Sequence, residues 1–463
     1  MNEVGLPKLL RRPDRALLSR LADSAAATDG AVTTNEQFLD WLSRRWWAHA
    51  QQVRPTRLDR MADWYVEPRT GDLRHTSGRF FSVEGLRVRR GDGPVPDWDQ
   101  PVIVQPETGL LGLLVREIGG LLHLLMQAKA EPGNIGGIQL APTVQATPSN
   151  YDRVHGGAAV PYVGHFLAPA PERVVAEVPL PGPGPWLAQG RNRALVVEAG
   201  PEVGAGPDFC WLTLGQVNAL LRQPNLVSAD ARTVLSTLPD WHADAGTPDA
   251  DTPDADDPYA AAETDRWIAR CGAAHQATVE RTALSRVAGW NPSPSGLADR
   301  SGLLFDIVAV DVRSARREVP AWSQPLLRPH RPGTAALLVK EVGGVPRLLL
   351  GAHPDPDRPG RVALGPTVRS TPDPYTDPRT PCLDAVHHAP PERVLFDTEL
   401  SEEGSRFHHA RTRHLVIDAS ALPDGADGRH HWVSLPGLDR LLDRGHRLDA
   451  EARTLLAALR AVR

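Results

Sequence analysis

The sequence predicts an α+β protein made of two tandem copies of one domain-sized unit. Both halves of the 463-residue chain show strand-like alternation and amphipathic helical spacing, the pattern of a largely antiparallel sheet with helices around it. Many segments of the first half return in the second at nearly constant offsets of 220 to 226 residues, which indicates duplication. The clearest pairs are 113–126 with 337–350, 140–151 with 364–375, 170–175 with 390–395, and 211–235 with 432–456.

An acidic segment separates the two repeats. Residues 242–263 hold seven acidic residues, no Lys or Arg, and a repeated TPDAD motif. Runs of this kind are usually solvated linkers, and we favour a linker over a metal-binding acidic tract. We therefore predict a first repeat at 1–243, a linker at 244–262, and a second, partly degenerate repeat at 263–463.

Each repeat is expected to open with a helix and to continue as strands. In the first repeat, residues 35–50 predict a helix with Phe38, Leu42 and Trp46 on one apolar stripe. Alternating residues and a Gly-Gly turn predict the strands and a hairpin that follow. The remaining elements are a strand at 78–89, a hairpin at 112–129, a strand at 195–199, and short helices at 213–223 and 229–238.

Composition argues against several classes of protein. The hydrophobic fraction is 41% and the charged fraction 23%, as in ordinary globular proteins. The formal net charge of −5 argues against broad binding to nucleic acid or to anionic membranes. No apolar run is long enough for a transmembrane helix, no secretory signal is visible, and the three cysteines form no CxxC pair. These observations predict a cytoplasmic protein without disulfides.

Sequence motifs for cofactors and metals are absent. There is no glycine-rich phosphate loop of the Rossmann or Walker type, and no HExxH, GxSxG or EF-hand motif. Adjacent histidine pairs would point to opposite faces of a strand, which is poor ligand geometry. We therefore predict no cofactor and no required metal, so any chemistry must come from ordinary acid–base side chains.

Two polar segments of the first repeat stand out as candidates for binding. At 75–85, His75 and Arg79 are harder to explain by core packing than the phenylalanines beside them. At 146–151, hydroxyl and amide side chains suit a turn, and they can also bind phosphate or sugar oxygens.

A third polar segment, residues 127–134, contains one of the three lysines of the chain. On an extended strand, Gln127, Lys129 and Glu131 would share one face, because alternate side chains point the same way. A row facing solvent explains the alternation equally well. The segment is therefore a candidate for catalysis and stays open at this point.

The motifs in these segments resemble those of a known family. The sequences HTSGRFFSVEGLRV (75–88), LLMQAKAEPGN (124–134) and QLAPTVQATPSNY (139–151), with counterparts in the second repeat, are similar to those of the NDP-hexose 2,3-dehydratases. The resemblance covers nearly the whole chain outside the linker. It implies two Nudix-like domains in tandem, but the segment after the hairpin lacks the Glu-rich metal box of a Nudix hydrolase.

The resemblance also implies a reaction in deoxysugar and antibiotic biosynthesis. Water is eliminated across C2–C3 of a dTDP-4-keto-6-deoxyhexose to give a 3,4-diketo-2,6-dideoxy sugar nucleotide. The C4 ketone acidifies the C3 proton, so the reaction needs a base at C3, an acid at the C2 hydroxyl and a donor at the ketone oxygen. A homodimer and a 3-ketoreductase that consumes the unstable product are the implied partners.

Four residues are the candidates for proton transfer under this resemblance. We expect Glu131 to act as the base and Lys129 to face the C4 enolate or the diphosphate. Tyr151 or His75 would then protonate the departing C2 hydroxyl. Mutual charge would keep Glu131 ionised and Lys129 protonated. The candidate substrate-binding residues are Trp64, Arg79, Gln127, Thr147, Ser149, Asn150, Trp290, Tyr375, Glu402 and Arg406.

The two repeats have lost different parts of the family pattern. The second repeat has Asp299 at the place of His75 and His353 at the place of Lys129, whereas it alone keeps the acidic turn at 400–410. The pocket could belong to the first repeat, or it could be a composite of both. The chain could also be a non-catalytic sugar-nucleotide-binding partner, or an isomerase on the same substrate class.

Overall fold

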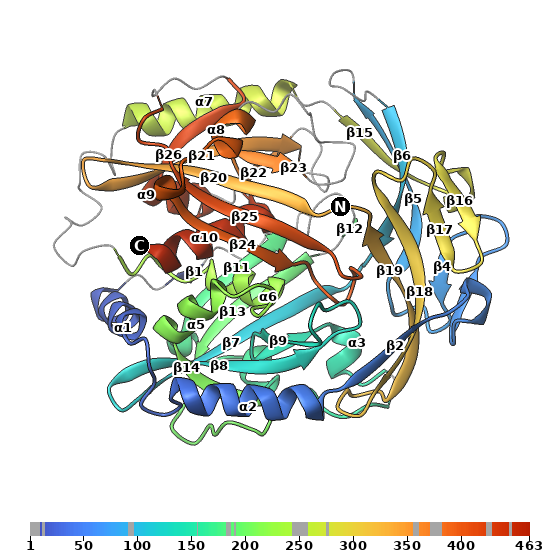
Figure 1. The fold of residues 1–463 in the computed structure, drawn as a ribbon, viewed down its shortest axis with the longest axis horizontal. Helices are drawn as coiled ribbons and strands as arrows, with labels where there is room; N and C mark the ends of the chain where they lie inside the picture. Colours follow the sequence, from blue (N-terminus) through green and yellow to red (C-terminus); the bar gives the residue numbers. More distant parts are fainter. Residues whose placement is uncertain are drawn as a thin grey trace.

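The computed structural model in Figure 1 combines two large mixed sheets, two smaller sheets and several helices, which confirms the predicted α+β class. Tyr375 and residues 243–257 of the acidic segment lie outside the residues that the structure describes. Within those residues, no helix is both long and apolar enough to cross a membrane. The described residues are 10–11, 14–90, 97–154, 156–181, 187–188, 191–242, 258–274, 277–354, 361–370, 382–422, 428–443 and 447–463.

The two large sheets repeat one strand order. The first runs β1-β11-β13-β7-β8-β14, and the second runs β24-β25-β20-β21-β22-β27. In the first sheet, β7 and β8 form the predicted hairpin, and Gly119 and Gly120 take the positive φ values of 61° and 82° that its tight turn requires. The first sheet contains β1 (Leu10–Arg11), β7 (Thr108–Ile118), β8 (Leu121–Ala130), β9 (Ile138–Ala141), β10 (Val144–Ala146), β11 (Val174–Pro181), β13 (Arg191–Glu198) and β14 (Phe209–Thr213). The second contains β20 (Gly333–Val342), β21 (Val345–Pro354), β22 (Val362–Gly365), β23 (Val368–Ser370), β24 (Val394–Ser401), β25 (Arg411–Asp418), β26 (His430–Ser434) and β27 (Arg447–Leu448).

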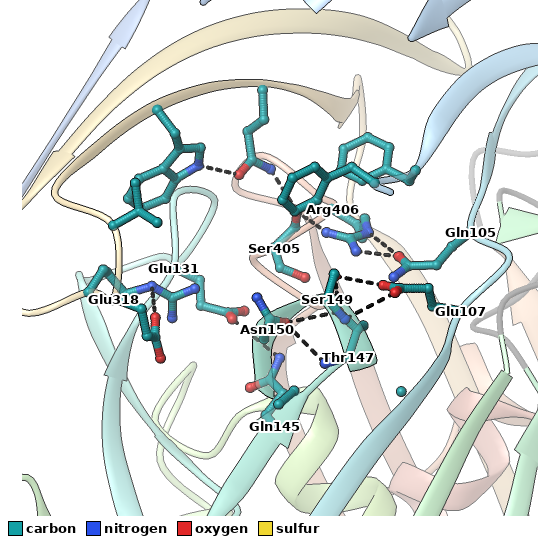
Figure 2. A pocket seen from close by; sticks show the side chains of 18 of the residues that line it. Gln105, Glu107, Glu131, Gln145, Thr147, Ser149, Asn150, Glu318, Ser405 and Arg406 are labelled. Carbon is teal, nitrogen blue, oxygen red and sulfur yellow. Dashed lines mark hydrogen bonds and ion pairs between the residues drawn. The ribbon is translucent and has the colours of Figure 1, made fainter. Parts of the chain in front are cut away.

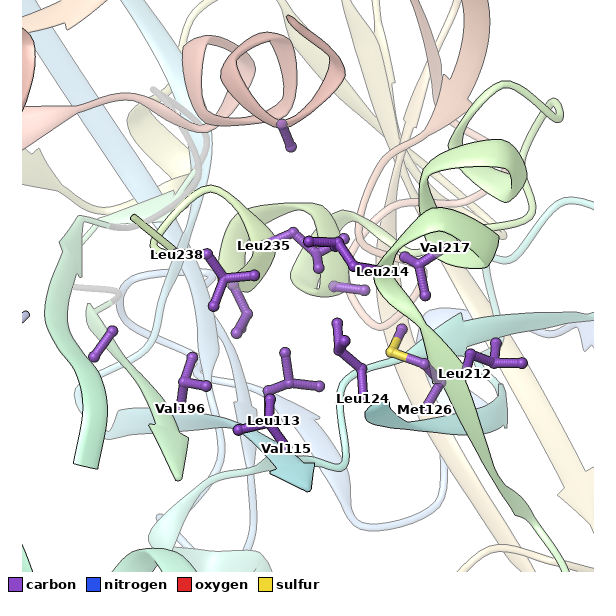
Figure 3. Packing of buried hydrophobic residues seen from close by; sticks show 14 of the residues in the cluster. Leu113, Val115, Leu124, Met126, Val196, Leu212, Leu214, Val217, Leu235 and Leu238 are labelled. Carbon is purple, nitrogen blue, oxygen red and sulfur yellow. The ribbon is translucent and has the colours of Figure 1, made fainter. Parts of the chain in front are cut away.

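Helices α6 and α10 lie between the two large sheets (Figure 1). In Figure 3, Leu113 and Leu124 of the first sheet face Leu235 of α6. Helix α10 belongs to the second repeat, yet its Ala457 is part of this core. The repeats therefore share one helical layer. The helices are α1 (Arg15–Ala26), α2 (Asn35–Ala48), α3 (Pro148–Tyr151), α4 (Gly164–Leu167), α5 (Leu214–Leu221), α6 (Ala229–Leu235), α7 (Pro258–Ala274), α8 (Leu383–His387), α9 (Leu435–Asp443) and α10 (Ala450–Val462).

Helix α2 forms where the sequence predicts it, but its predicted apolar stripe is only partly buried. Phe38 is 3% exposed, whereas Trp46 and Trp47 are 47% and 72% exposed. The indole N–H of Trp46 donates to the carbonyl of Gly136 at 2.8 Å. The last turn of the helix thus lies over a loop, and the apolar stripe is buried only toward its N-terminal end.

The two smaller sheets exchange strands between the repeats. Strand β15 (Ala277–Thr282) of the second repeat pairs antiparallel with β5 (Ser82–Arg90) of the first. Reciprocally, β2 (Gln51–Pro55) of the first repeat pairs with β18 (Phe305–Ser314) of the second. Each repeat therefore completes a sheet of the other. The other strands of these sheets are β3 (Trp64–Val66), β4 (Leu73–His75), β6 (Asp97–Val104), β12 (Leu187–Ala188), β16 (Trp290–Ser293), β17 (Gly296–Asp299) and β19 (Ala321–Pro329).

One hydrophobic cluster between the smaller sheets joins both repeats. It packs Trp64 and Phe81 of the first repeat with Trp290 and Phe305 of the second. The indole N–H of Trp64 donates to the carbonyl of Ser323 at 2.7 Å, which ties the first repeat to β19 of the second. This shared core brings the loop before β19 to the edge of the first repeat.

Candidate active site

A cavity of about 260 Å³ lies where the two repeats meet (Figure 2). The first large sheet forms its floor, and the second repeat contributes the loop before β19 and the turn after β24. Its geometry is therefore that of the composite pocket considered above. The polar residues that line it include Asp63, His75, Gln105, Glu107, Lys129, Glu131, Gln145, Thr147, Ser149, Asn150, Asn192, Asp230, Arg317, Glu318, Gln324, Glu403, Ser405 and Arg406.

At the floor of the cavity, the end of β8 brings Lys129 and Glu131 together, as their alternation predicts. The Lys129 Nζ lies 3.6 Å from Glu131 Oε1, and the two side chains are 11% and 8% exposed. Gln145 of β10 joins them, because Lys129 Nζ donates to Gln145 Oε1 at 3.0 Å and Gln145 Nε2 donates to Glu131 Oε1 at 3.2 Å. Gln127, the third residue of the predicted row, does not line the cavity.

Burial opposes the protonation that the charge of Glu131 favours at Lys129. Burial lowers the pKa of Lys129, and the attraction of Glu131 offsets this only in part. The mutual charge of the pair favours the ammonium form of Lys129, and its removal from water disfavours that form.

Two further carboxyl groups adjoin this pair, that of the half-buried Glu403 and that of the buried Asp230. Burial raises the pKa of Glu403, and Glu131 adds like-charge repulsion, while Arg406 opposes the change. Burial likewise raises the pKa of Asp230 well above its usual value, with Glu403 and Glu131 as like-charged neighbours. Buried carboxyls with raised pKa values in a cavity are typical of sites that transfer protons.

Helix α3 begins after Thr147, and the polar groups of residues 147–150 mostly bond to one another and to Glu107. The backbone N–H of Thr147 donates to Asn150 Oδ1 at 3.0 Å. The backbone N–H and the hydroxyl of Ser149 donate to the carboxylate of Glu107 at 3.0 and 2.7 Å. All three side chains line the cavity, as expected of ligand-binding residues, but Tyr151 packs against a hydrophobic cluster behind it.

The acidic turn of the second repeat supplies Arg406 to the cavity. Its guanidinium donates to Gln105 Oε1, with Nε at 3.1 Å, and its carbon Cζ lies 4.4 Å from the centre of the Phe81 ring. Gln324 Nε2 donates to the carbonyl of Ser405 at 2.8 Å and so fixes the turn. A cation is thereby held at the rim by residues from both repeats.

An aromatic group closes another side of the cavity. The rings of Trp64 and His75 meet edge to face at 5.4 Å, and His75 Nδ1 lies 2.8 Å from the Ser77 hydroxyl. Trp322 of the second repeat also lines this part of the wall. Arg79, which follows in the same segment, is exposed and lies outside the lining.

The remaining predicted site residues lie elsewhere. Trp290 is buried in the shared core and donates its indole N–H to the carbonyl of Phe305 at 2.9 Å. Glu402 lines a neighbouring cavity of about 40 Å³ and accepts a hydrogen bond from Thr412 Oγ1 at 2.7 Å. Within the described residues, no group of three or more His, Cys, Asp or Glu side chains could hold a metal ion. The absence of a required metal stays a prediction.

Sequence reasoning missed several residues of the wall. The sequence held a signal for Gln145 and Asp230, because both repeats have polar side chains at these positions: the second repeat has Arg369 and Glu451 there. For Trp322 of β19 and the loop before that strand there was no signal, since their place at the cavity follows from the shared core alone. The missed residues include Gln105, Glu107, Gln145, Asp230, Arg317, Glu318 and Trp322.

Comparisons with known proteins agree with the resemblance of the motifs. A family model described as NDP-hexose 2,3-dehydratase matches residues 35–238 and 261–459. A protein of Streptomyces violaceoruber named dTDP-4-dehydro-6-deoxy-alpha-D-glucopyranose 2,3-dehydratase is 42% identical over 93% of this chain and 98% of its own length. A protein of the same name from Amycolatopsis orientalis is 40% identical over 96% of this chain and 93% of its own. A solved structure titled as an ADP compounds hydrolase is 18% identical, covers 34% of this chain and 85% of its own, and has a TM-score of 0.23, too low to support an argument.

Proposed function

The chain belongs to the NDP-hexose 2,3-dehydratase family, and we propose that it eliminates water across C2–C3 of a dTDP-4-keto-6-deoxyhexose. The product is a 3,4-diketo-2,6-dideoxy sugar nucleotide of deoxysugar biosynthesis. The observation that carries the proposal is the buried pair of Lys129 and Glu131, joined by Gln145, on the floor of a cavity that both repeats line. The names of the relatives supply the substrate class.

In this proposal Glu131 is the base that removes the C3 proton. The electron pair of the C3–H bond moves into a C3–C4 double bond, and the negative charge passes to the C4 oxygen. Lys129 lies beside Glu131 and stabilises that oxygen, because a nearby cation favours an enolate in a site shielded from water. Departure of the C2 hydroxyl then forms the C2–C3 double bond, and the enol tautomerises without any change of redox state.

Basic residues at the rim are suited to the diphosphate. Arg406 and Arg317 line the cavity from the second repeat, and both lie against aromatic rings, those of Phe81 and Trp322. Guanidinium groups bind phosphate oxygens in pairs, and aromatic faces are suited to a nucleobase. The sugar would thereby reach the floor while the nucleotide stays near Trp322.

Several finer features belong to the same proposal. Each repeat would have a Nudix-like topology, with domain boundaries at 243 and 263, although α7 already begins at Pro258 within the expected linker. A cytoplasmic location, a homodimer and a 3-ketoreductase partner follow from the family resemblance. A non-catalytic sugar-nucleotide-binding protein would have no need of a buried acid–base pair, so the geometry favours the enzyme over this alternative.

Turnover of dTDP-4-keto-6-deoxyglucose in deuterated water tests the proposal. NMR and mass spectrometry after a borohydride quench should show the loss of one water and the entry of solvent deuterium at C2 during tautomerisation. Bound but chemically unchanged substrate would instead favour the non-catalytic partner. A rearranged product that keeps its water would favour an isomerase.

A further inference from the structure

The carboxyl group of Asp230 has no role in the steps described so far. Asp230 lies in the first turn of α6, is 8% exposed, and lines both the active-site cavity and the smaller cavity behind it. In the part of the chain that the structure describes, no hydrogen bond or ion pair to this carboxyl is found. A buried carboxyl without a partner is costly when charged, and it is then held more easily as the neutral acid.

The second repeat shows how the same position looks when its charge is neutralised. Glu451, the equivalent of Asp230, lies 3.0 Å from the guanidinium of Arg369. Arg369 also pairs with Asp449 at the start of α10. In the first repeat the equivalent of Arg369 is Gln145, an uncharged side chain that bonds to Lys129 and Glu131 instead. The first repeat thus lacks the arginine that would keep this carboxyl ionised.

The charges that surround Asp230 act in the same direction. Glu403 and Glu131 repel a negative charge at Asp230, while Lys129 and Arg232 attract one, and burial outweighs that attraction, so the pKa of Asp230 is raised. Arg232 is itself bonded to the carbonyls of Val227 and Ser401. The other titratable groups that line the smaller cavity are Glu402, His414, Glu451 and Arg453.

We propose that Asp230 is the general acid that protonates the departing C2 hydroxyl. This inference rests on the proposed dehydration. The C2–O bond breaks as the enolate electron pair forms the C2–C3 double bond, and the proton of Asp230 joins the hydroxide to leave as water. Glu131 has gained the C3 proton, so one proton passed from Glu131 to Asp230 restores both groups. No oxidant or reductant is required.

The other candidates for the acid are less well placed. Tyr151 packs behind the cavity, and burial raises the pKa of its phenol, which makes it a weaker acid. His75 lines the cavity, but its Nδ1 is engaged with Ser77 among aromatic rings. Asp230 is the candidate that adjoins Glu131 and Glu403 within the buried polar floor.

The variant Asp230→Asn separates the two halves of the reaction. We expect water elimination to fall by about 10²–10⁴-fold, the usual effect of losing a general acid. Exchange of the C3 proton with deuterated water, measured by NMR in recovered substrate, should continue at near the wild-type rate of enolisation. Unchanged elimination would overturn the proposal, as would equal loss of exchange and elimination, which would place Asp230 in the first step.

Two further variants complete the test. Gln145→Arg introduces the arginine that the second repeat has at the equivalent position. That arginine should favour the ionised form of Asp230, so the alkaline limb of the kcat–pH profile should move to lower pH. An alkaline limb at the wild-type pH would contradict the proposal. Glu451→Gln makes the matched change outside the active-site cavity, and the ratio of exchange to elimination should stay at the wild-type value. If the wild-type protein itself shows neither exchange nor elimination, the proposed dehydration fails before Asp230 is tested.

Discussion

Replacing Glu131 by glutamine removes the proposed base with little change in volume. The Glu131 carboxylate accepts a hydrogen bond from Gln145 Nε2 at 3.2 Å and lies 3.6 Å from Lys129 Nζ. The amide oxygen of a glutamine can still accept the hydrogen bond from Gln145. Glu403 and Asp230 lose a like-charged neighbour. Lys129 loses its counter-charge but keeps its hydrogen bonds to the backbone carbonyl and Oε1 of Gln145, so the fold should persist.

The expected loss lies in kcat. A positioned base contributes about 10²–10⁴-fold, which corresponds to about 3 to 5 kcal/mol of barrier at 1.36 kcal/mol per tenfold. Glu131 is 8% exposed on its side chain, so water does not readily replace it as a base. Affinity for dTDP should stay near the wild-type value, because the proposed phosphate contacts lie with Arg406 and Arg317.

The assay measures C3 proton exchange and water loss by NMR, with dTDP affinity from calorimetry. Exchange and elimination should fall together, in contrast to Asp230→Asn. Glu399→Gln is the matched control, because Glu399 pairs with Arg411 at 3.2 Å on the exposed surface, and such pairs contribute little. Wild-type exchange in Glu131→Gln would refute the assignment and leave Glu403 as the next candidate.

Three other outcomes are expected. Arg406→Met should raise KM for the sugar nucleotide by roughly 10–100-fold with kcat little changed, since a charged hydrogen bond contributes about 1.5–3 kcal/mol; an equal fall in kcat would argue against a binding role. His414 is fully buried, and burial lowers the pKa of its imidazole from 6.5 to about 3. The folded state therefore favours the neutral ring, so the stability linked to His414 is fully present above pH 6.5 and is lost as the pH falls toward 3. By linkage this amounts to about 2 kcal/mol between pH 6.5 and 5, and His414→Gln should flatten the acid side of the stability profile in denaturant titrations. Treatment with EDTA should leave turnover unchanged, whereas loss of activity with rescue by a divalent ion would contradict the absence of a metal.

Local patterns predicted the local parts of this fold. The Gly119–Gly120 turn and its flanking alternation identify the β7–β8 hairpin, because neighbouring residues alone determine it. The strand expected at 78–89 begins only at Ser82, since the residues before it form a turn at the cavity. The strand exchange left no trace in the sequence, because pairing of β15 with β5 depends on contacts between distant segments.

In the candidate site, too, local features were predicted and contacts between distant segments were not. Lys129 and Glu131 were identifiable because alternation on one strand is a local property. Trp290 was misplaced beside its repeat partner Trp64, because equivalent residues in the two repeats face different surroundings: Trp64 reaches the cavity wall, and Trp290 stays in the core. In sequence, Asp230 is a first-turn residue of a helix whose carboxyl recurs as Glu451 in the second repeat, but its burial in the cavity floor is visible only in the structure.

The exchanged strands set an order of events during synthesis on the ribosome. Pro55 of β2 pairs with Val310 of β18, and the 255 residues from Thr56 to Val310 take about 13 to 50 s to translate at 5–20 residues per second. Strand β5 likewise waits for β15, since Leu86 pairs with Arg281, 195 residues later, and until then the edge of β5 is uncovered. An uncovered strand edge invites pairing with other chains. Slow translation at high expression should therefore favour aggregates over native molecules.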